Sequence, residues 1–389
     1  MGRGARSSSE AAVAWCRRPA PAASLEAAAG RDRRRPARVL SIDGGGIRGV
    51  IPATVLAELE ARTGRPTAEL FDLIAGTSTG AIIALALTMP GADGKPKWSA
   101  ADLVELYETE GPGIFHRSLW RRLSTLSGVI APKYSDRALD RTLEAYFGDA
   151  RLSDALADVL VPAYDTERHR PFFFRSQRAR NFRNKDFPLR EVVRAAVGAP
   201  TYFAPVQVTN EISGRSYSLI DGGVFANNPA LCAWADAQEA GVADDAVVLS
   251  LGTGSQTAPL EHDRIKGWGL RGWAPEILDV VFRGVSNTTS YQLRQLLGDD
   301  HYLRLQTTLD LASDKMDRAT KKNLAALKDE ARHLLDANDN AIDRFVGRLN
   351  DPSPAAEPPT PRTPRRSTRE AFELLARQRQ PAPPAAERP

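Results

Sequence analysis

The residues best suited to chemistry in this 389-residue chain form a short segment bounded by glycines, Gly76-Thr77-Ser78-Thr79-Gly80. It follows the apolar run 71–75, which predicts a strand, and precedes the apolar run 81–85, which predicts a helix. Glycine two residues to either side lets the chain turn so tightly that the serine hydroxyl is pushed outward, at a helix N-terminus whose amides favour negative charge. The pattern predicts a nucleophile elbow, with Ser78 as nucleophile and Gly76 and Gly80 as its supports, rather than a turn without function.

A second glycine-rich segment, Asp43-Gly44-Gly45-Gly46-Ile47-Arg48-Gly49, follows the apolar run 37–42. Its Gly-x-Gly-x-x-Gly spacing also occurs in dinucleotide-binding folds, but those need an acid at the end of the next strand, and here Asp72 lies near the start of that strand. Consecutive glycine amides can instead bind an anion, and the arginine adds positive charge nearby. We therefore expect Gly44, Gly45, Gly46 and Arg48 to form an oxyanion hole.

A third segment places Asp221 at the end of a predicted strand, followed by Gly222 and Gly223, which permit close approach of other groups. An Asp-Gly-Gly sequence alone is usually only a turn. Its interpretation as a general base depends on the histidines, because a Ser-His-Asp hydrolase needs one on a loop after a late strand. None of the five has neighbours that single it out: His116, His169, His262, His301 and His333. A serine–aspartate dyad is favoured, and an esterase or peptidase that uses His169, His262 or His301 is the alternative.

The three segments must act together because a carboxylate is a weak base for a serine hydroxyl. Burial raises the pKa of a carboxyl group, while a helix end and glycine amides stabilise the alkoxide and the tetrahedral oxyanion. We expect Ser78 to attack an ester carbonyl while Asp221 takes the proton and returns it to the leaving alcohol. Asp221 then activates the water that releases the acyl group.

Taken in their order along the chain, the three segments resemble the marks of the patatin-like phospholipase family: Asp-Gly-Gly-Gly-x-Arg/Lys-Gly, Gly-x-Ser-x-Gly and Asp-Gly-Gly/Ala. The run 195–205 is similar to the family's Ala-Pro-x-x-Phe-x-Pro block, although Val197-Gly198 departs from its usual Ser-x-Ala. The resemblance, which covers about residues 38–350, implies a three-layer α/β/α fold and a catalytic Ser78–Asp221 dyad. It also implies a calcium-independent phospholipase A type of activity on phospholipids or related lipids, with no cofactor and no metal. A non-catalytic storage or binding protein with this fold is the other alternative, and the intact motifs speak against it.

The elements that must position these residues alternate along the chain: strands at 37–42 and 71–75, helices at 51–62 and 80–88. This order predicts an α/β fold with a mostly parallel central sheet covered by helices. Further strands are expected at 159–164, 171–175 and 246–251, and further helices at 102–110 and 319–335. The region 97–149 is helical in pattern and predicts a helical insertion beside the sheet.

Composition divides the chain into three parts. A basic leader, 1–37, has eight arginines against three acids, and a tail, 351–389, has seven arginines against five acids and holds 10 of the 27 prolines. Both compositions are typical of disordered segments. The catalytic domain is therefore predicted at 38–350. Of the net charge of +4, this body carries −3, which argues against nucleic acid as a partner.

The same composition limits where the protein acts. No run of about 18 apolar residues is present, so contact with a membrane is expected to be peripheral. Two stretches offer an apolar mouth for a lipid, Ile114-Phe115 with Leu119-Trp120, and 268–270 with Trp273. The two cysteines, Cys16 and Cys232, favour neither a disulfide framework nor a metal site and fit a cytoplasmic location.

Overall fold

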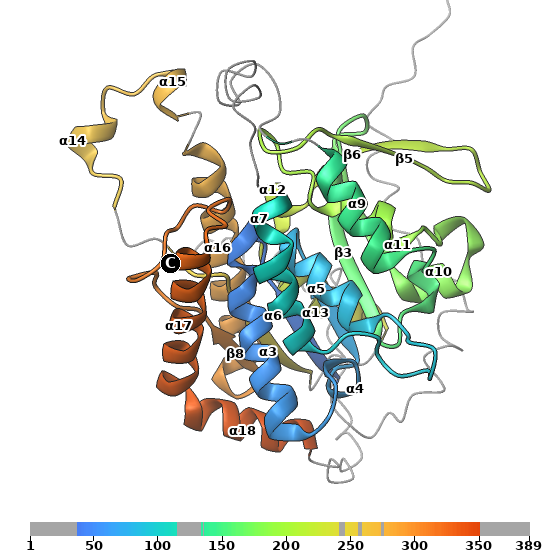
Figure 1. Cartoon of the computed structure of the whole chain (residues 1–389). Coiled ribbons are helices and arrows are strands. Elements are labelled where there is room, and N and C mark those ends of the chain that lie inside the picture. The colour runs from blue at the N-terminus through green and yellow to red at the C-terminus, as the bar shows by residue number, and fades with distance from the viewer. Residues whose placement is uncertain are drawn as a thin grey trace, which may run out of the picture. The chain divides into compact units, whose positions relative to one another are not determined.

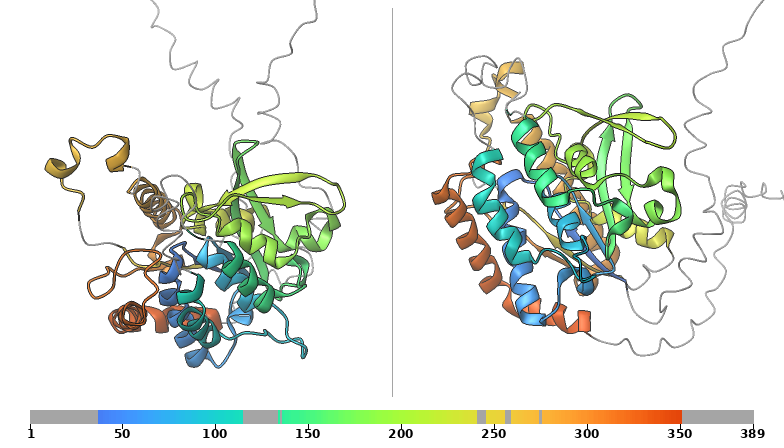
Figure 2. Two further views of the ribbon diagram at one scale, coloured as in Figure 1. Left: turned by 45° about the horizontal axis from the view of Figure 1, so that its top comes forward. Right: turned by 45° about the vertical axis from the view of Figure 1, so that its right-hand side comes forward.

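The computed structural model describes residues 37–114, 134, 136–240, 246–255, 259–273 and 276–350. Its centre is an eight-stranded sheet with helices against it, seen from three directions in Figures 1 and 2. The strands are β1 (Arg38–Ile42), β2 (Leu73–Gly76), β3 (Asp158–Asp165), β4 (Arg170–Arg175), β5 (Val206–Thr209), β6 (Ser216–Asp221), β7 (Val247–Leu251) and β8 (Tyr302–Leu305). The predicted leader, apart from Ala37, and the predicted tail lie outside the described residues, so the domain limits stay a prediction.

Five strands form the parallel part of the sheet, in the order β3-β2-β1-β7-β8. β4 and β6 both run antiparallel to β3, and β5 runs antiparallel to β6. Leu160 of β3 pairs with β2 and with β4, and Ala163 pairs with β4 and with β6. Since a strand has only two edges, β2 and β6 share the edge opposite β4. Their carboxyl ends therefore point toward each other along β3.

Side chains that alternate along the strands pack into two apolar layers, as the period of two requires. Leu40, Ile42 and Ile74 face one layer, and Val39 and Leu73 face the other. The first layer contains the longer helices α3 (Val50–Thr63), α5 (Thr79–Thr88), α6 (Ala100–Thr109), α9 (Asp136–Phe147), α11 (Leu189–Ala196), α17 (Lys321–Ala337) and α18 (Asp339–Asn350). The second contains α13 (Ala230–Glu239) and α16 (Ile277–His301).

Shorter helices connect these elements, mostly where the chain turns. They are η2 (Gly46–Gly49), α4 (Thr67–Leu70), α7 (Gly111–Ile114), η4 (Leu152–Asp154), α10 (Ser176–Asn181), η5 (Arg183–Lys185), α12 (Gly223–Ala226), α14 (His262–Ile265) and α15 (Leu270–Trp273). In Figure 1, α7, α12 and α15 lie toward the top, the end of the sheet where the parallel strands finish. This is the end at which an open parallel sheet places its ligands.

The predicted fold class is confirmed: a mostly parallel sheet lies between two layers of helices. The expected strands and helices are present with ends shifted by up to about two residues, as is usual for element boundaries. The predicted insertion at 97–149 contains α6, α7 and α9 within the described residues, while 115–133 and 135 lie outside them. Two short strands, β5 and β8, were not predicted.

Candidate active site

Ser78 lies on the tight turn between β2 and α5, as the glycine spacing predicts. Its backbone has φ 54° and ψ −121°, and residues other than glycine rarely adopt such a positive φ. It is the N-cap residue of α5, yet its side chain caps no amide of that helix. Its hydroxyl therefore stays available at the positive end of the helix dipole, which favours negative charge on the oxygen.

The turn can form only because its flanking residues lack side chains. A Cβ on Gly80 would lie 2.3 Å from the carbonyl oxygen of Ile42, and one on Gly76 would lie 2.1 Å from that of Gly80. Both contacts are with backbone, which cannot move away cheaply. The absence of side chains at Gly76 and Gly80 thus allows the turn to pack closely on itself and on β1.

The glycine segment after β1 runs directly beside the serine. A Cβ on Gly44 would lie 3.2 Å from the Cβ of Ser78. The Gly44 amide already donates to the carbonyl oxygen of Asn227 at 3.0 Å. The amides of Gly45 and Gly46, in contrast, have no acceptor among the described residues, and Gly46 lines the cleft that holds Ser78. Of the three glycines in the predicted oxyanion hole, Gly44 is thus the one whose amide is already engaged within the described residues.

Arg48 is placed behind this segment. Its guanidinium donates to the carbonyl oxygens of Gly45 and Gly254 at 3.3 and 3.4 Å, and its side chain does not line the cleft. The hydroxyl of Thr253 donates to the carbonyl oxygen of Gly44 at 2.8 Å. Arg48 therefore shapes the glycine segment from within the protein.

The start of the glycine segment is fixed by two residues to which the sequence analysis assigned no role. Asp43 and Arg304 form a two-pronged ion pair, with N–O distances of 2.8 and 2.6 Å, and their side chains are 2% and 8% exposed. Arg304 also donates to the Ser250 hydroxyl at 2.8 Å. A buried, doubly hydrogen-bonded pair is geometrically specific. Because Arg304 comes from β8 at the sheet edge, 261 residues from its partner, no local pattern announces it.

Asp221 ends β6 and is completely buried. One carboxylate oxygen, Oδ1, accepts from the Gly223 amide at 2.8 Å, and Gly222 is the N-cap of α12. The other oxygen, Oδ2, has no hydrogen-bond partner within the described part of the chain. Burial raises the pKa of Asp221 from 3.8 to about 6, although the Gly223 amide and the Ser78 hydroxyl both act to lower it. The carboxyl group can therefore change its protonation state close to neutral pH.

The sheet topology brings Ser78 and Asp221 together. Ala75 pairs with Leu160, and Asp221 pairs with Ala163, on the same edge of β3. The two turns are further joined by the Thr77 hydroxyl, which donates to the carbonyl oxygen of Ala226 at 2.6 Å. The Ser78 hydroxyl is near enough to Asp221 to lower the pKa of its carboxyl group, although the carboxylate oxygen Oδ2 has no well-formed hydrogen bond within the described residues. Such contacts often tighten only when substrate binds.

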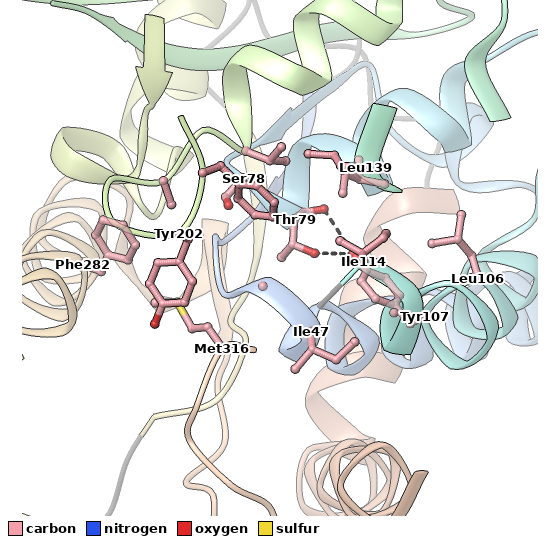
Figure 3. A pocket seen from close by; sticks show the side chains of 16 residues that line it. Ile47, Ser78, Thr79, Leu106, Tyr107, Ile114, Leu139, Tyr202, Phe282 and Met316 are labelled. Carbon is pink, nitrogen blue, oxygen red and sulfur yellow. Dashed lines mark hydrogen bonds between the residues drawn. The ribbon is translucent and has the colours of Figure 1, made fainter. Parts of the chain in front are cut away.

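Ser78 opens into a cleft with an almost wholly apolar lining. The cleft encloses about 720 Å³ of space without atoms, part of it open to solvent. Figure 3 shows Tyr202, Phe282 and Met316 on one side of Ser78 and Leu106, Tyr107 and Ile114 on the other. These residues belong to segments spread over more than 200 positions. An acyl chain fits a lining of this kind better than a polar substrate does.

The helical insertion forms one wall of this cleft through Leu106, Tyr107, Ile114 and Leu139. The Tyr107 hydroxyl also hydrogen-bonds the Thr79 side chain, and it donates to the Thr79 carbonyl oxygen at 3.3 Å. Thr79 follows Ser78 directly. The insertion is therefore tied to the turn that carries the serine. Of the first predicted apolar stretch, Ile114 lines the cleft and the other three residues lie outside the described ranges.

The four histidines that the structure describes do not line the cleft. His169 lies in the turn between β3 and β4, His262 begins α14 and His301 ends α16. His333 lies within α17, and the fifth, His116, falls outside the described residues. None of these four histidines therefore lies where it could act as the general base of a Ser-His-Asp triad with Ser78.

The described residues contain no group of three or more His, Cys, Asp or Glu side chains arranged to hold a metal ion. Across the same ranges, no helix is both long and apolar enough to cross a membrane. The single described cysteine, Cys232, is unpaired and partly buried, and burial raises the pKa of its thiol to about 11.

Comparison with known proteins gives consistent matches. A family model described as "Patatin-like phospholipase" matches residues 40–234. Patatin-like protein 2 of Arabidopsis thaliana is 33% identical over 335 residues, covering 76% of this chain and 82% of that protein. Patatin-like protein 4 of the same plant is 31% identical over 334 residues, covering 77% and 83%. A solved structure, the "Crystal structure of type III effector protein ExoU", covers 83% of this chain and 57% of its own at 11% identity and a TM-score of 0.35, a likeness too low to carry an argument.

Proposed function

The chain belongs to the patatin-like phospholipase family and is a lipid acyl hydrolase, and we propose that it cleaves fatty acyl esters with a Ser78–Asp221 dyad. The observation that carries this proposal is the position of Ser78. It lies on a strained turn at an apolar cleft, next to a buried carboxyl group whose pKa is raised to about 6. An unstrained surface serine would have none of these neighbours.

The reaction proceeds in two balanced steps. Ser78 Oγ attacks the ester carbonyl carbon, and its proton passes to Asp221 Oδ2, the oxygen that lacks a partner among the described residues. The tetrahedral oxyanion accepts hydrogen bonds from the amides of Gly45 and Gly46. It then collapses, and the leaving alcohol takes the proton from Asp221. In the second step Asp221 removes a proton from water, and the resulting hydroxide attacks the acyl carbon. The bond to Ser78 Oγ then breaks, Oγ takes the proton back from Asp221, and the fatty acid is released.

The pKa of the base suits this work. A general base is most effective when its pKa lies near the working pH, and an ordinary aspartate is too acidic for that. At neutral pH, Asp221 is ionised and ready to accept a proton, yet more basic than a solvent-exposed aspartate. The Gly223 amide fixes the orientation of the carboxyl group through Oδ1 and leaves Oδ2 for the proton.

The proposed substrates are phospholipids or related lipids at a membrane surface, because the cleft is apolar and the family acts on lipids. A cytoplasmic location, inferred from the two cysteines, stays a prediction. Calcium independence belongs to the same proposal, since every polar group used in the two steps comes from the chain itself.

The direct test measures fatty acid release from phospholipid vesicles, and from a monomeric short-chain ester, with a calcium chelator present. We expect Ser78→Ala and Asp221→Asn to abolish both activities while circular dichroism shows an intact fold. Variants of His169, His262 and His301 serve as matched controls and retain activity. Turnover that survives Asp221→Asn but disappears in one of the histidine variants would refute the dyad in favour of a triad.

A further inference from the structure

A segment before α16 exposes a large apolar side chain and two half-buried tryptophans that no part of the proposed chemistry uses. This segment, residues 259–273, contains α14 and α15 and is called the tryptophan arm here. Its Leu270 is 87% exposed, the highest value among the exposed large hydrophobic residues of the described chain. The rings of Trp268 and Trp273 pack edge to face, with centres 5.6 Å apart. The two rings thus pack against each other across the start of α15, where Leu270 lies.

The arm leads directly to the cleft. Beyond it, the first turns of α16 expose Ile277 (44%) and Val280 (41%), and Phe282 two residues later lines the cleft beside Ser78. Figures 1 and 2 show α14 and α15 extending beyond the start of α16, away from the sheet and toward the end where the parallel strands finish. Exposed apolar side chains therefore occur both on the arm and at the start of the helix that reaches the cleft.

The charges around the arm suit a phospholipid surface. Arg264 stacks over the Trp268 ring, 5.6 Å from its centre, and Lys266 lies on the same segment. Tryptophan is favoured at a bilayer interface because its ring is apolar while its N–H is polar. Arginine and lysine next to it can meet lipid phosphates. Acidic residues also occur, and Asp263 pairs with Lys266 at 2.8 Å, so the arm is amphipathic rather than strongly basic.

We propose that the tryptophan arm docks the protein onto a phospholipid bilayer, with Leu270 inserted below the headgroups and the two tryptophans at their level. Helix α16 follows the arm, exposes Ile277 and Val280 in its first turns and contributes Phe282 to the cleft, so docking by the arm places the mouth of the cleft near the bilayer. This inference rests on the proposed lipid hydrolase function and names the surface that delivers its substrate.

The test uses the full chain and phosphatidylcholine vesicles. Phosphatidylcholine has no net charge, so electrostatic attraction of the arginine-rich ends of the chain contributes little to binding. The variant is Leu270→Asp, and the matched control is Leu296→Asp, which changes a 58% exposed leucine near the other end of α16. We expect Leu270→Asp to lower vesicle affinity in cosedimentation at least tenfold, because burial of one leucine contributes about that factor. Fatty acid release from vesicles falls in proportion, and hydrolysis of a monomeric short-chain ester is unchanged.

Several outcomes would overturn the docking surface. They are unchanged vesicle affinity in Leu270→Asp, an equal loss in Leu296→Asp, or a change in oligomeric state with Leu270→Asp, which would assign the arm to a second copy of the chain. Tryptophan fluorescence gives a second measurement: vesicles shift the wild-type emission to the blue, and Trp268→Phe with Trp273→Phe removes most of that shift. A wild-type protein that binds vesicles but cleaves neither vesicle lipid nor the short-chain ester would instead sink the proposed function and leave the docking surface intact.

Discussion

Replacing Asp221 with asparagine should remove activity and at the same time stabilise the fold at neutral pH. Asparagine has nearly the same shape, and its side-chain oxygen can still accept from the Gly223 amide. It carries no charge, so the cost of burying an ionised group disappears. Activity and stability are therefore expected to move in opposite directions at this one position.

The size of the effect follows from the pKa. The carboxyl group goes from its ordinary 3.8 to about 6 in the folded protein, which corresponds to roughly 3 kcal/mol of unfolding free energy. Because the folded state binds the proton more tightly, wild-type stability declines as the pH rises from 3.8 through about 6. The advantage of Asp221→Asn is thus expected to be about 0.5 kcal/mol at pH 4 and to reach about 3 kcal/mol above pH 7.5.

Urea denaturation of both proteins at several pH values measures this difference directly. All other carboxyl groups titrate alike in the two proteins, so their contributions cancel. Ser78→Ala is the control for activity, since it removes turnover but keeps the Asp221 carboxyl group and therefore its dependence on pH. An advantage of the same size at pH 4 and pH 8, or an Asp221→Asn protein that is less stable at pH 8, would refute the account of Asp221 as a buried group with a raised pKa.

Three further predictions follow from the same site. The kcat/KM for a monomeric ester should fall about tenfold per pH unit below about pH 6, because Asp221 must be deprotonated to accept the serine proton, and a flat profile down to pH 4 would contradict this. Gly45→Ala should lower kcat by about a hundredfold or more with an intact fold, since its Cβ would lie 2.2 Å from Thr253 Oγ1 and displace the amides, and steady-state kinetics measures the loss. Arg304→Gln should cost about 3 kcal/mol or more of unfolding free energy by leaving Asp43 buried without its partner, and the double variant with Asp43→Asn should recover part of it in urea denaturation.

The parts of the site that are built from residues close together in the sequence could be predicted from the sequence. The elbow around Ser78 is such a part, because strand, glycine spacing and helix lie within 18 residues, from 71 to 88. The role of Asp221 was harder to predict, because an Asp-Gly-Gly turn is common. Asp221 was proposed as the general base only because no histidine had neighbours that single it out. The alternation of elements was enough for the α/β class, and the ends of most elements were found within about two residues.

What could not be predicted depends on contacts between distant segments. The β8 strand has only four residues and follows a 25-residue helix, so no periodicity marks it, and Arg304 was missed with it. The Gly44 amide looked equal to its neighbours until the structure placed it against the Asn227 carbonyl oxygen. The cleft lining was out of reach for the same reason, because Met316 and Leu106 meet only through the fold.

The ion pair between Asp43 and Arg304 bears on how this protein can be divided. Every family motif identified in the sequence lies between residues 43 and 229, which is within the 40–234 stretch that the family model matches. A fragment cut at residue 234 would keep Ser78, Asp221 and all the motif glycines. It would lose Thr253, which follows β7, and Arg304 of β8, two side chains that hold the glycine segment. The smallest autonomous catalytic unit is therefore larger than the smallest piece that carries the family's signature.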